Sequence, residues 1–179
     1  MKLRKALIAT GAAVALLATP VAVGMAPAQA APAKASGTTL ISFKKEYAGI
    51  FKLVKPVSPA KFINSQLTFP ITGTQKGGMV VLHSGGIELG STKFTNPIIT
   101  INEAKKTAKI TMAFEDGRIP VFTAKHFKVK ASGVDGQAWQ GDLHLTNNKT
   151  VVATLNQLLG VKSLTPGLGL GQIRVTIKK

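Results

Sequence analysis

Short runs in which every second residue is apolar recur through most of this chain, and turn signals separate them about every ten residues. The alternation is most regular over residues 126–131, 139–145 and 173–177. Residues i and i+2 of a strand lie on the same face, so each of these runs can bury one face and expose the other. Roughly nine or ten such runs predict an all-β fold, either an antiparallel β-sandwich or a partly open barrel.

The alternation also assigns side chains to faces. The residues predicted to point inward in two of these runs are Phe127, Val129, Ala131, Leu143 and Leu145. His126, Asp142 and His144 then fall on the polar outer face. His83 stands in a different context, because it follows an apolar run between two glycine pairs.

Glycine-containing pairs mark the hairpins. Asp116-Gly117 lies between two apolar runs and is typical of a tight hairpin turn. Gly77-Gly78 and Gly85-Gly86 flank the run at residues 79–83, where glycine can supply the positive φ that tight turns need. These pairs predict antiparallel neighbours along the chain.

Prolines interrupt the pattern at two places. Pro56 and Pro59 follow a predicted strand fragment at residues 50–54 and predict a loop, because proline fixes φ and lacks the N–H that a sheet uses. Asn96-Pro97 predicts a turn or the edge of a sheet.

One segment near the C-terminus has helical periodicity instead. Its apolar residues at helical spacing are Val151, Leu155, Leu158 and Leu159. Asn147 or Asn148 can cap its start, and Gly160 stands just past its end. We therefore predict one short α-helix near residues 148–159, whose apolar stripe lies on a sheet or closes the end of the sandwich.

The first 30 residues have the features of a secretory signal peptide. A basic start and an apolar run precede Ala28-Gln29-Ala30, a small-x-small cleavage site. A membrane anchor is the alternative, since the apolar run nearly reaches the roughly 20 residues of a spanning helix. We favour cleavage, which predicts a secreted protein with a flexible lead at residues 31–37, one domain at residues 38–179 and no transmembrane segment in the mature form.

The chain is strongly basic, with 23 lysine and arginine residues, seven acidic residues and a net charge of +16. Removal of the signal takes away three basic residues, and the remaining 20 basic and seven acidic residues give +13. A secreted basic protein meets anionic envelope polymers and lipid headgroups first. Scattered lysines and few aromatic residues argue against nucleic acid as a partner. The absence of cysteine excludes disulfides and thiolate metal sites.

The residue sets that catalysis requires are largely missing. There is no G-x-S-x-G motif for a serine hydrolase, and Glu115-Asp116 are better explained as turn residues than as a pair of catalytic carboxylates. Asp142-x-His144 is the best fragment of a zinc site, but zinc needs three or four ligands in one place. We therefore predict a protein that is not an enzyme.

A haem site needs fewer protein groups, because one axial ligand suffices when the pocket walls are apolar. Tyrosine is a known axial ligand and binds ferric iron best as phenolate, so a nearby histidine that accepts or shares its proton helps. Tyr47, the only tyrosine of the chain, and His83 would form this pair.

Residues 77–101, GGMVVLHSGGIELGSTKFTNPIITI, resemble the G-x-φ-x-φ-x-G-H-x-G-x-L…N-P-x-I core of the HtaA-type domain of secreted and cell-surface actinobacterial proteins. The segments FPITG, GRIPVF and LNQLLG extend the likeness to short secreted proteins grouped with this type. The resemblance implies an antiparallel β-sandwich with a minor helix that binds haem in iron acquisition. His83 then matches the histidine of the motif, and the run from Ser42 to Tyr47 matches the segment that supplies the axial tyrosine.

Two hypotheses follow from these observations. In the first, the protein is a secreted, non-catalytic module that binds haem or a haem-carrying protein. Ser42, Tyr47 and His83 form its site, and Tyr47 is the ligand of the haem iron. In the second, it is a basic protein of the cell envelope that binds anionic wall polymers and carries no cofactor.

Overall fold

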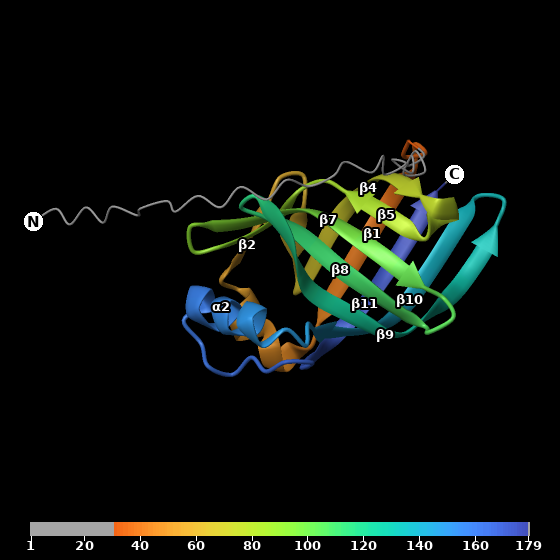
Figure 1. The fold of residues 1–179 in the computed structure, drawn as a ribbon. Coiled ribbons are helices and arrows are strands. Elements are labelled where there is room, and N and C mark those ends of the chain that lie inside the picture. The colour runs from red at the N-terminus through yellow and green to blue at the C-terminus, as the bar shows by residue number, and fades with distance from the viewer. Residues whose placement is uncertain (1–30, 179) are drawn as a thin grey trace, which may run out of the picture.

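The computed structural model describes residues 31–178, and the predicted signal peptide lies outside the described residues (Figure 1). The strands are β1 (Ser36–Phe43), β2 (Val54–Val57), β3 (Lys61–Ile63), β4 (Gln66–Gln75), β5 (Val80–His83), β6 (Gly86–Leu89), β7 (Thr92–Asn102), β8 (Thr107–Phe114), β9 (Gly117–Gly133), β10 (Gly136–Leu145) and β11 (Gly169–Lys178). The helical segments are η1 (Lys45–Tyr47), α1 (Ala48–Phe51), η2 (Lys76–Gly78) and α2 (Lys149–Leu159).

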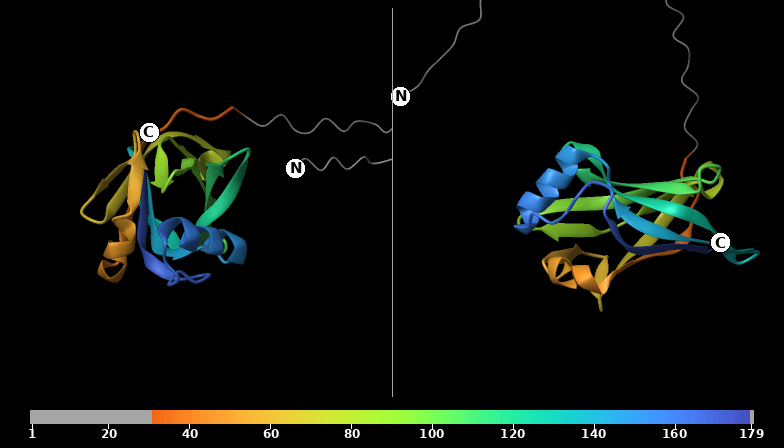
Figure 2. Two further views of the ribbon diagram at one scale, coloured as in Figure 1. Left: turned by 90° about the vertical axis from the view of Figure 1, so that its left-hand side faces the viewer. Right: turned by 90° about the horizontal axis from the view of Figure 1, so that it is seen from below.

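Eight antiparallel strands close into a barrel in the order β7-β5-β4-β1-β11-β10-β9-β8, and β8 pairs back with β7. Strand β7 pairs with β6 over residues 92–95 and with β5 over residues 98–100, so one end of the barrel carries extra strands. There β2 adds to β6, and β3 adds to β4. Seen along its axis, the wall forms a ring (Figure 2, left). The all-β prediction is confirmed, in its barrel form.

Apolar side chains fill the inside of this barrel. On β10, Trp139, Leu143 and Leu145 are buried, as the alternation predicts for the two leucines. Two internal cavities measure only about 10 and 20 Å³. Pockets for small organic ligands measure roughly 300–1,000 Å³. These two spaces therefore belong to a packed core and are too small for such a ligand.

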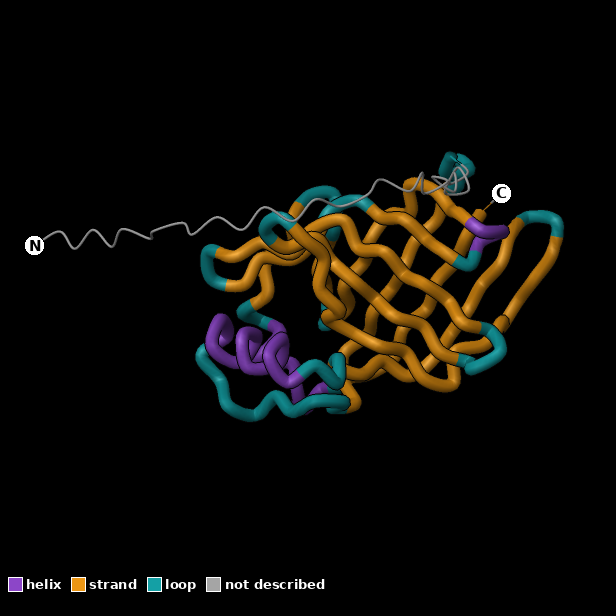
Figure 3. The backbone as a smooth tube through the Cα atoms, viewed as in Figure 1, coloured by secondary structure: helices purple, strands orange, loops and turns teal. Residues whose placement is uncertain are grey.

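Helix α2 lies across one end of the barrel (Figure 3). The Asn148 side chain caps it by accepting hydrogen bonds from two backbone N–H groups of the first turn, at 3.0 and 3.2 Å. Gly160 ends it with φ 64°, in the left-handed region. Leu155 and Leu159 face an apolar space against the barrel strands. The helix prediction is thus confirmed, and within residues 31–178 no helix is long and apolar enough to cross a membrane.

The prediction of a strand at residues 50–54 is wrong. This stretch contains the end of α1 and a turn, and β2 begins only at Val54. Phe51 stacks on Phe43, with ring centroids 3.6 Å apart. The apolar residues that suggested a strand therefore bury an aromatic contact in a short helical turn.

Two proline positions also differ from the predictions. Pro56 lies within β2, not in a loop, and β2 is an edge strand, where a missing N–H can face away from the ladder. Asn96-Pro97 lies inside β7, where the register shifts between Thr95 and Ile98 and Asn96 has φ 47°. The pair makes a bulge instead of a turn.

Strand β9 is longer than the alternation indicates. It joins two predicted runs into 17 residues, and a bulge at His126, with φ 50°, separates them. The β9–β10 hairpin extends past the other strands (Figure 1). Val129 and Ala131, predicted to point inward, are exposed, although Trp139 and Ala138, their partners on β10, are buried.

Candidate functional site

His83 lies inside the barrel with 5% of its surface exposed. Its Nδ1–H donates to the carbonyl oxygen of Pro97 at 3.0 Å, and its Nε2 accepts from the hydroxyl of Thr39 at 2.7 Å. This assignment of the ring proton follows from the partners, because a carbonyl oxygen can only accept. The edge of Phe69 also packs near the ring. Both nitrogens of His83 are thus satisfied within the core.

Burial lowers the pKa of His83 to about 4, and the hydrogen bond to Pro97 offsets part of this effect. The ring is therefore neutral at pH 7. The internal cavity beside it measures about 10 Å³ and is lined mainly by apolar side chains. We interpret His83 as a structural residue that joins three barrel strands, β5, β1 and β7.

Tyr47, the predicted axial ligand, is half-buried in η1, just after β1 ends at Phe43. Partial burial, followed by the neighbouring Glu46, raises the pKa of the Tyr47 phenol. Thr39, the partner of His83, stands four residues before Phe43, which is about 13 Å along a strand. The structure therefore does not bring Tyr47 and His83 together.

Ser42 belongs to the outer face of the barrel wall. It is half-buried in β1, where it stands opposite Gln66 of β4 and Gln172 of β11. His83 points to the inside of the same wall. The three residues that the sequence grouped into one site thus occupy the outer wall, the end of β1 and the interior.

A different cluster lies on the surface, in a cleft of about 510 Å³ that we call the basic cleft. Its polar side chains are Lys44, Lys125, His126, Asp142, His144 and Gln172. They come from the segment after β1 and from the outer faces of β9, β10 and β11. The alternation predicted the outward position of both histidines, but it could not show that Lys44 and Gln172 join them.

Asp142 holds this cluster in place. Its Oδ2 accepts from His126 Nδ1–H at 2.7 Å, and its Oδ1 accepts from Gln172 Nε2–H at 2.7 Å. The bond from His126, with a smaller contribution from Gln172, lowers the pKa of Asp142. His144 Nδ1–H donates to the carbonyl oxygen of Gly167 at 3.1 Å. Among the described residues, none forms a hydrogen bond with Nε2 of either histidine.

Asp142 and His144, the best fragment of a zinc site in the sequence, are not joined among the described residues by the further ligands that zinc needs. Within residues 31–178, no group of three or more metal-binding side chains could hold an ion. Asp142 instead uses both carboxylate oxygens in hydrogen bonds with protein side chains.

Every lysine and arginine of residues 31–178 is exposed. In this part of the chain only two of them form ion pairs, Lys44 with Glu46 at 3.6 Å and Lys93 with Glu88 at 3.9 Å. The contact of His126 with Asp142 is a hydrogen bond of 2.7 Å. The outer surface therefore carries a large excess of positive charge that acidic side chains do not balance.

No family profile and no curated protein matches this sequence. Among solved structures, the chain is similar to the C-terminal domain of HtaA from Corynebacterium glutamicum, with a TM-score of 0.57 and 14% sequence identity. The match covers 82% of this chain and 99% of that domain. The predicted likeness to the HtaA type is thus confirmed at the level of the fold.

Proposed function

We propose that this protein is a secreted, non-catalytic binding module that attaches to anionic polymers of the cell envelope through its basic outer surface. The observation that carries the proposal is the exposed position of every lysine and arginine of residues 31–178. The barrel beneath them is packed, and its two internal cavities are far smaller than a ligand pocket. Positive charge on the outside attracts and concentrates polyanions.

Secretion rests on the signal predicted at residues 1–30. Once outside the cell, a chain with a net charge of +13 would meet wall polymers and membrane headgroups, both of which carry negative charge. Non-covalent attraction of this kind can retain the protein at the cell surface. The barrel then serves as a rigid scaffold for the charges.

Binding to a polyanion is expected to depend steeply on salt. The purified protein should bind poly(glycerol phosphate) at 50 mM NaCl, and its affinity should fall roughly tenfold or more by 300 mM, because salt screens exposed charges. Isothermal titration calorimetry measures the change, and uncharged dextran is the control polymer. Affinity that does not change with salt would contradict the proposal.

Haem is the second candidate ligand, and the position of Tyr47 favours it. Its half-exposed phenol lies at the surface, two and three residues after the exposed Lys45 and Lys44. Tyrosinate can ligate ferric haem, and lysines can pair with haem propionates. The resemblance to the HtaA type, whose members bind haem, supports this reading. In this arrangement His83 takes no part, because both of its nitrogens have core partners.

Tyr47→Phe tests the haem hypothesis, because it keeps the ring and removes the oxygen ligand. Hemin added to the wild-type protein should give a shifted Soret band, and the variant should lose it. The affinity should rise from pH 7 to pH 9, since ligation releases the phenol proton and the pKa of Tyr47 is raised. An absorption spectrum identical to that of free hemin, with the wild-type protein present, would exclude haem.

A further inference from the structure

We propose that the basic cleft is the specific site at which this protein grips a phosphodiester group of an anionic envelope polymer. This inference rests on the proposed function and deepens it, since it assigns one site and one chemical group to an attraction that would otherwise be spread over the surface. Two features support it: lysines that approach from separate segments, and an acidic side chain whose two oxygens already accept hydrogen bonds from protein side chains.

The cationic groups of the basic cleft converge from separate segments. Lys44 follows β1 and Lys125 belongs to β9, and the imidazole of His144 on β10 lies in the same cleft. A Cβ atom at Gly169 would lie 3.5 Å from His144 Cε1 and 3.9 Å from Lys44 Nζ. Lys44 and His144 therefore approach the same point above a backbone that has no side chain.

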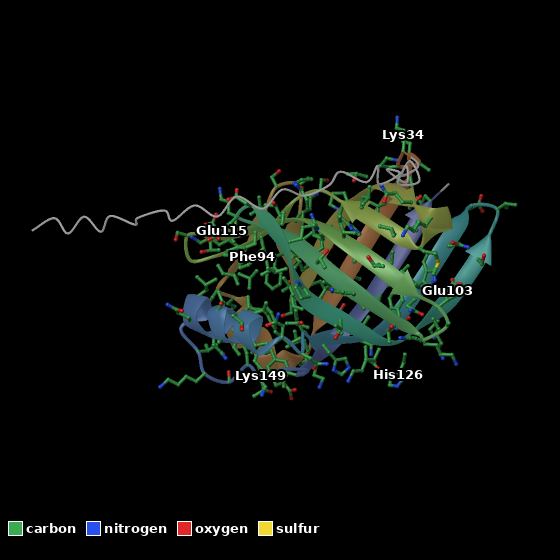
Figure 4. The ribbon with its side chains drawn as sticks, in the orientation of Figure 1. Lys34, Phe94, Glu103, Glu115, His126 and Lys149 are labelled. Carbon is green, nitrogen blue, oxygen red and sulfur yellow. The ribbon has the colours of Figure 1, made fainter. Side chains whose placement is uncertain are left out.

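The one acidic side chain that lines the cleft already has hydrogen-bond partners. Asp142 accepts hydrogen bonds from His126 and Gln172, one on each oxygen. The bond to Asp142 fixes Nδ1 of His126 as a donor and holds the ring at the rim of the cleft. Figure 4 shows His126 on the outer surface of the barrel. With donors on both oxygens, Asp142 repels an anion less than a free carboxylate would.

Glu46 is the other acidic residue near the cleft, through its 3.6 Å ion pair with Lys44. Both side chains of this pair are more than half exposed, at 53% and 59%. Exposed pairs of this kind are worth about 0–1 kcal/mol, so Lys44 can exchange Glu46 for a ligand.

The type and spacing of the donors favour phosphate over carboxylate. Carboxylates are recognised best by the planar, two-pronged guanidinium of arginine, and no arginine lines this cleft. Each lysine is a separate point donor, which suits the tetrahedral oxygens of a phosphate. A volume of about 510 Å³ also has room for the polyol units on either side of one phosphate.

Two charge-matched double variants test the site. Lys44→Gln/Lys125→Gln removes two positive charges from the cleft, and Lys76→Gln/Lys162→Gln removes two exposed charges elsewhere. At 150 mM NaCl we expect the first variant to bind poly(glycerol phosphate) at least about tenfold more weakly, because it loses hydrogen bonds to the ligand. The second should lose less than about twofold, because it loses only long-range attraction, which salt screens. If both variants weaken binding equally, the basic cleft is not the specific site, but binding through the basic outer surface as a whole still holds. Absence of wild-type binding even at 50 mM NaCl would overturn both.

A small ligand and two further probes identify the chemical group. Glycerophosphoglycerol should shift the NMR signals of the His126 and His144 rings and leave those of buried His83 unchanged. Polyglutamate carries carboxylates instead of phosphates. If it also binds the protein, and Lys44→Gln/Lys125→Gln weakens that binding as much as it weakens binding of poly(glycerol phosphate), the phosphodiester assignment is overturned. Binding to phosphatidylglycerol vesicles without binding to the polymer would contradict a wall polymer as the source of the group. Preference for the polymer supports the proposal.

Discussion

Gly86→Ala is expected to destabilise the protein by about 3 kcal/mol or more, enough to unfold a marginally stable domain. Strand β6 runs so close to β7 that a Cβ atom at residue 86 would lie 2.1 Å from the carbonyl oxygen of Phe94 and 2.8 Å from Cα of Thr95. Both atoms are backbone, so no side-chain rotation can relieve the clash. The strands would have to separate where the barrel carries its extra strands.

Gly117→Ala is the matched control for this variant. Residue 117 also pairs within a hairpin, but a Cβ atom there meets nothing within 4 Å and its φ is not positive. Gly117→Ala should change the free energy of unfolding by less than about 1 kcal/mol. Urea unfolding followed by tryptophan fluorescence measures both variants. If Gly86→Ala unfolds at the same urea concentration as wild type, the close approach of β6 and β7 is wrong.

The second large effect is acid destabilisation through His83. Its pKa is about 4 in the folded protein, against an ordinary value of 6.5. Below pH 6.5 His83 takes up a proton in the unfolded chain, whereas in the folded chain it stays neutral until about pH 4. The free energy of unfolding therefore falls as the pH drops and levels off near pH 4. The difference corresponds to about 3 kcal/mol. Asp142 contributes little in this window, because the stability that its lowered pKa provides is lost mainly as the pH falls below its ordinary value of 3.8.

Urea unfolding at intervals between pH 7 and pH 4 measures this loss. His83→Gln should be less stable at pH 7, because a core hydrogen-bonding group changes shape, but most of the pH dependence should disappear. If His83→Gln does not fold, an NMR titration of the His83 ring in the wild-type protein decides the matter instead. A midpoint near pH 6.5 would contradict the buried, neutral ring.

Local patterns were sufficient for most of the secondary structure. The alternation in β10 and β11 and the capped helix α2 are encoded within a few residues of each position, by side-chain period and by caps such as Asn148. The secondary-structure predictions failed where a contact outside the repeating pattern fixed the local backbone. Phe51 is an example, because its stacking on Phe43 accompanies a helical turn where a strand was predicted.

The residues that the sequence grouped into one site lie apart in the structure, whereas the predicted fold class is confirmed. Tyr47 and His83 each stand in an informative local context, but their separation depends on how β1, β4 and β5 pair. That pairing turns His83 toward the interior and Thr39, while Tyr47 stays beyond the end of β1. Haem binding through Tyr47 remains a separate prediction, which no longer depends on His83.

Periodicity, turn residues and charge are properties of neighbouring positions, and they decided the strands, the helix and the basic surface of this protein. Closure of the barrel, exposure of Val129 and assembly of the basic cleft came only from the tertiary structure. The reason is that alternation tells which residues share a face, but not which strand covers that face or where its cover ends. Lys44 and Gly169 meet because β1 pairs with β11, a contact between residues more than a hundred positions apart in the chain.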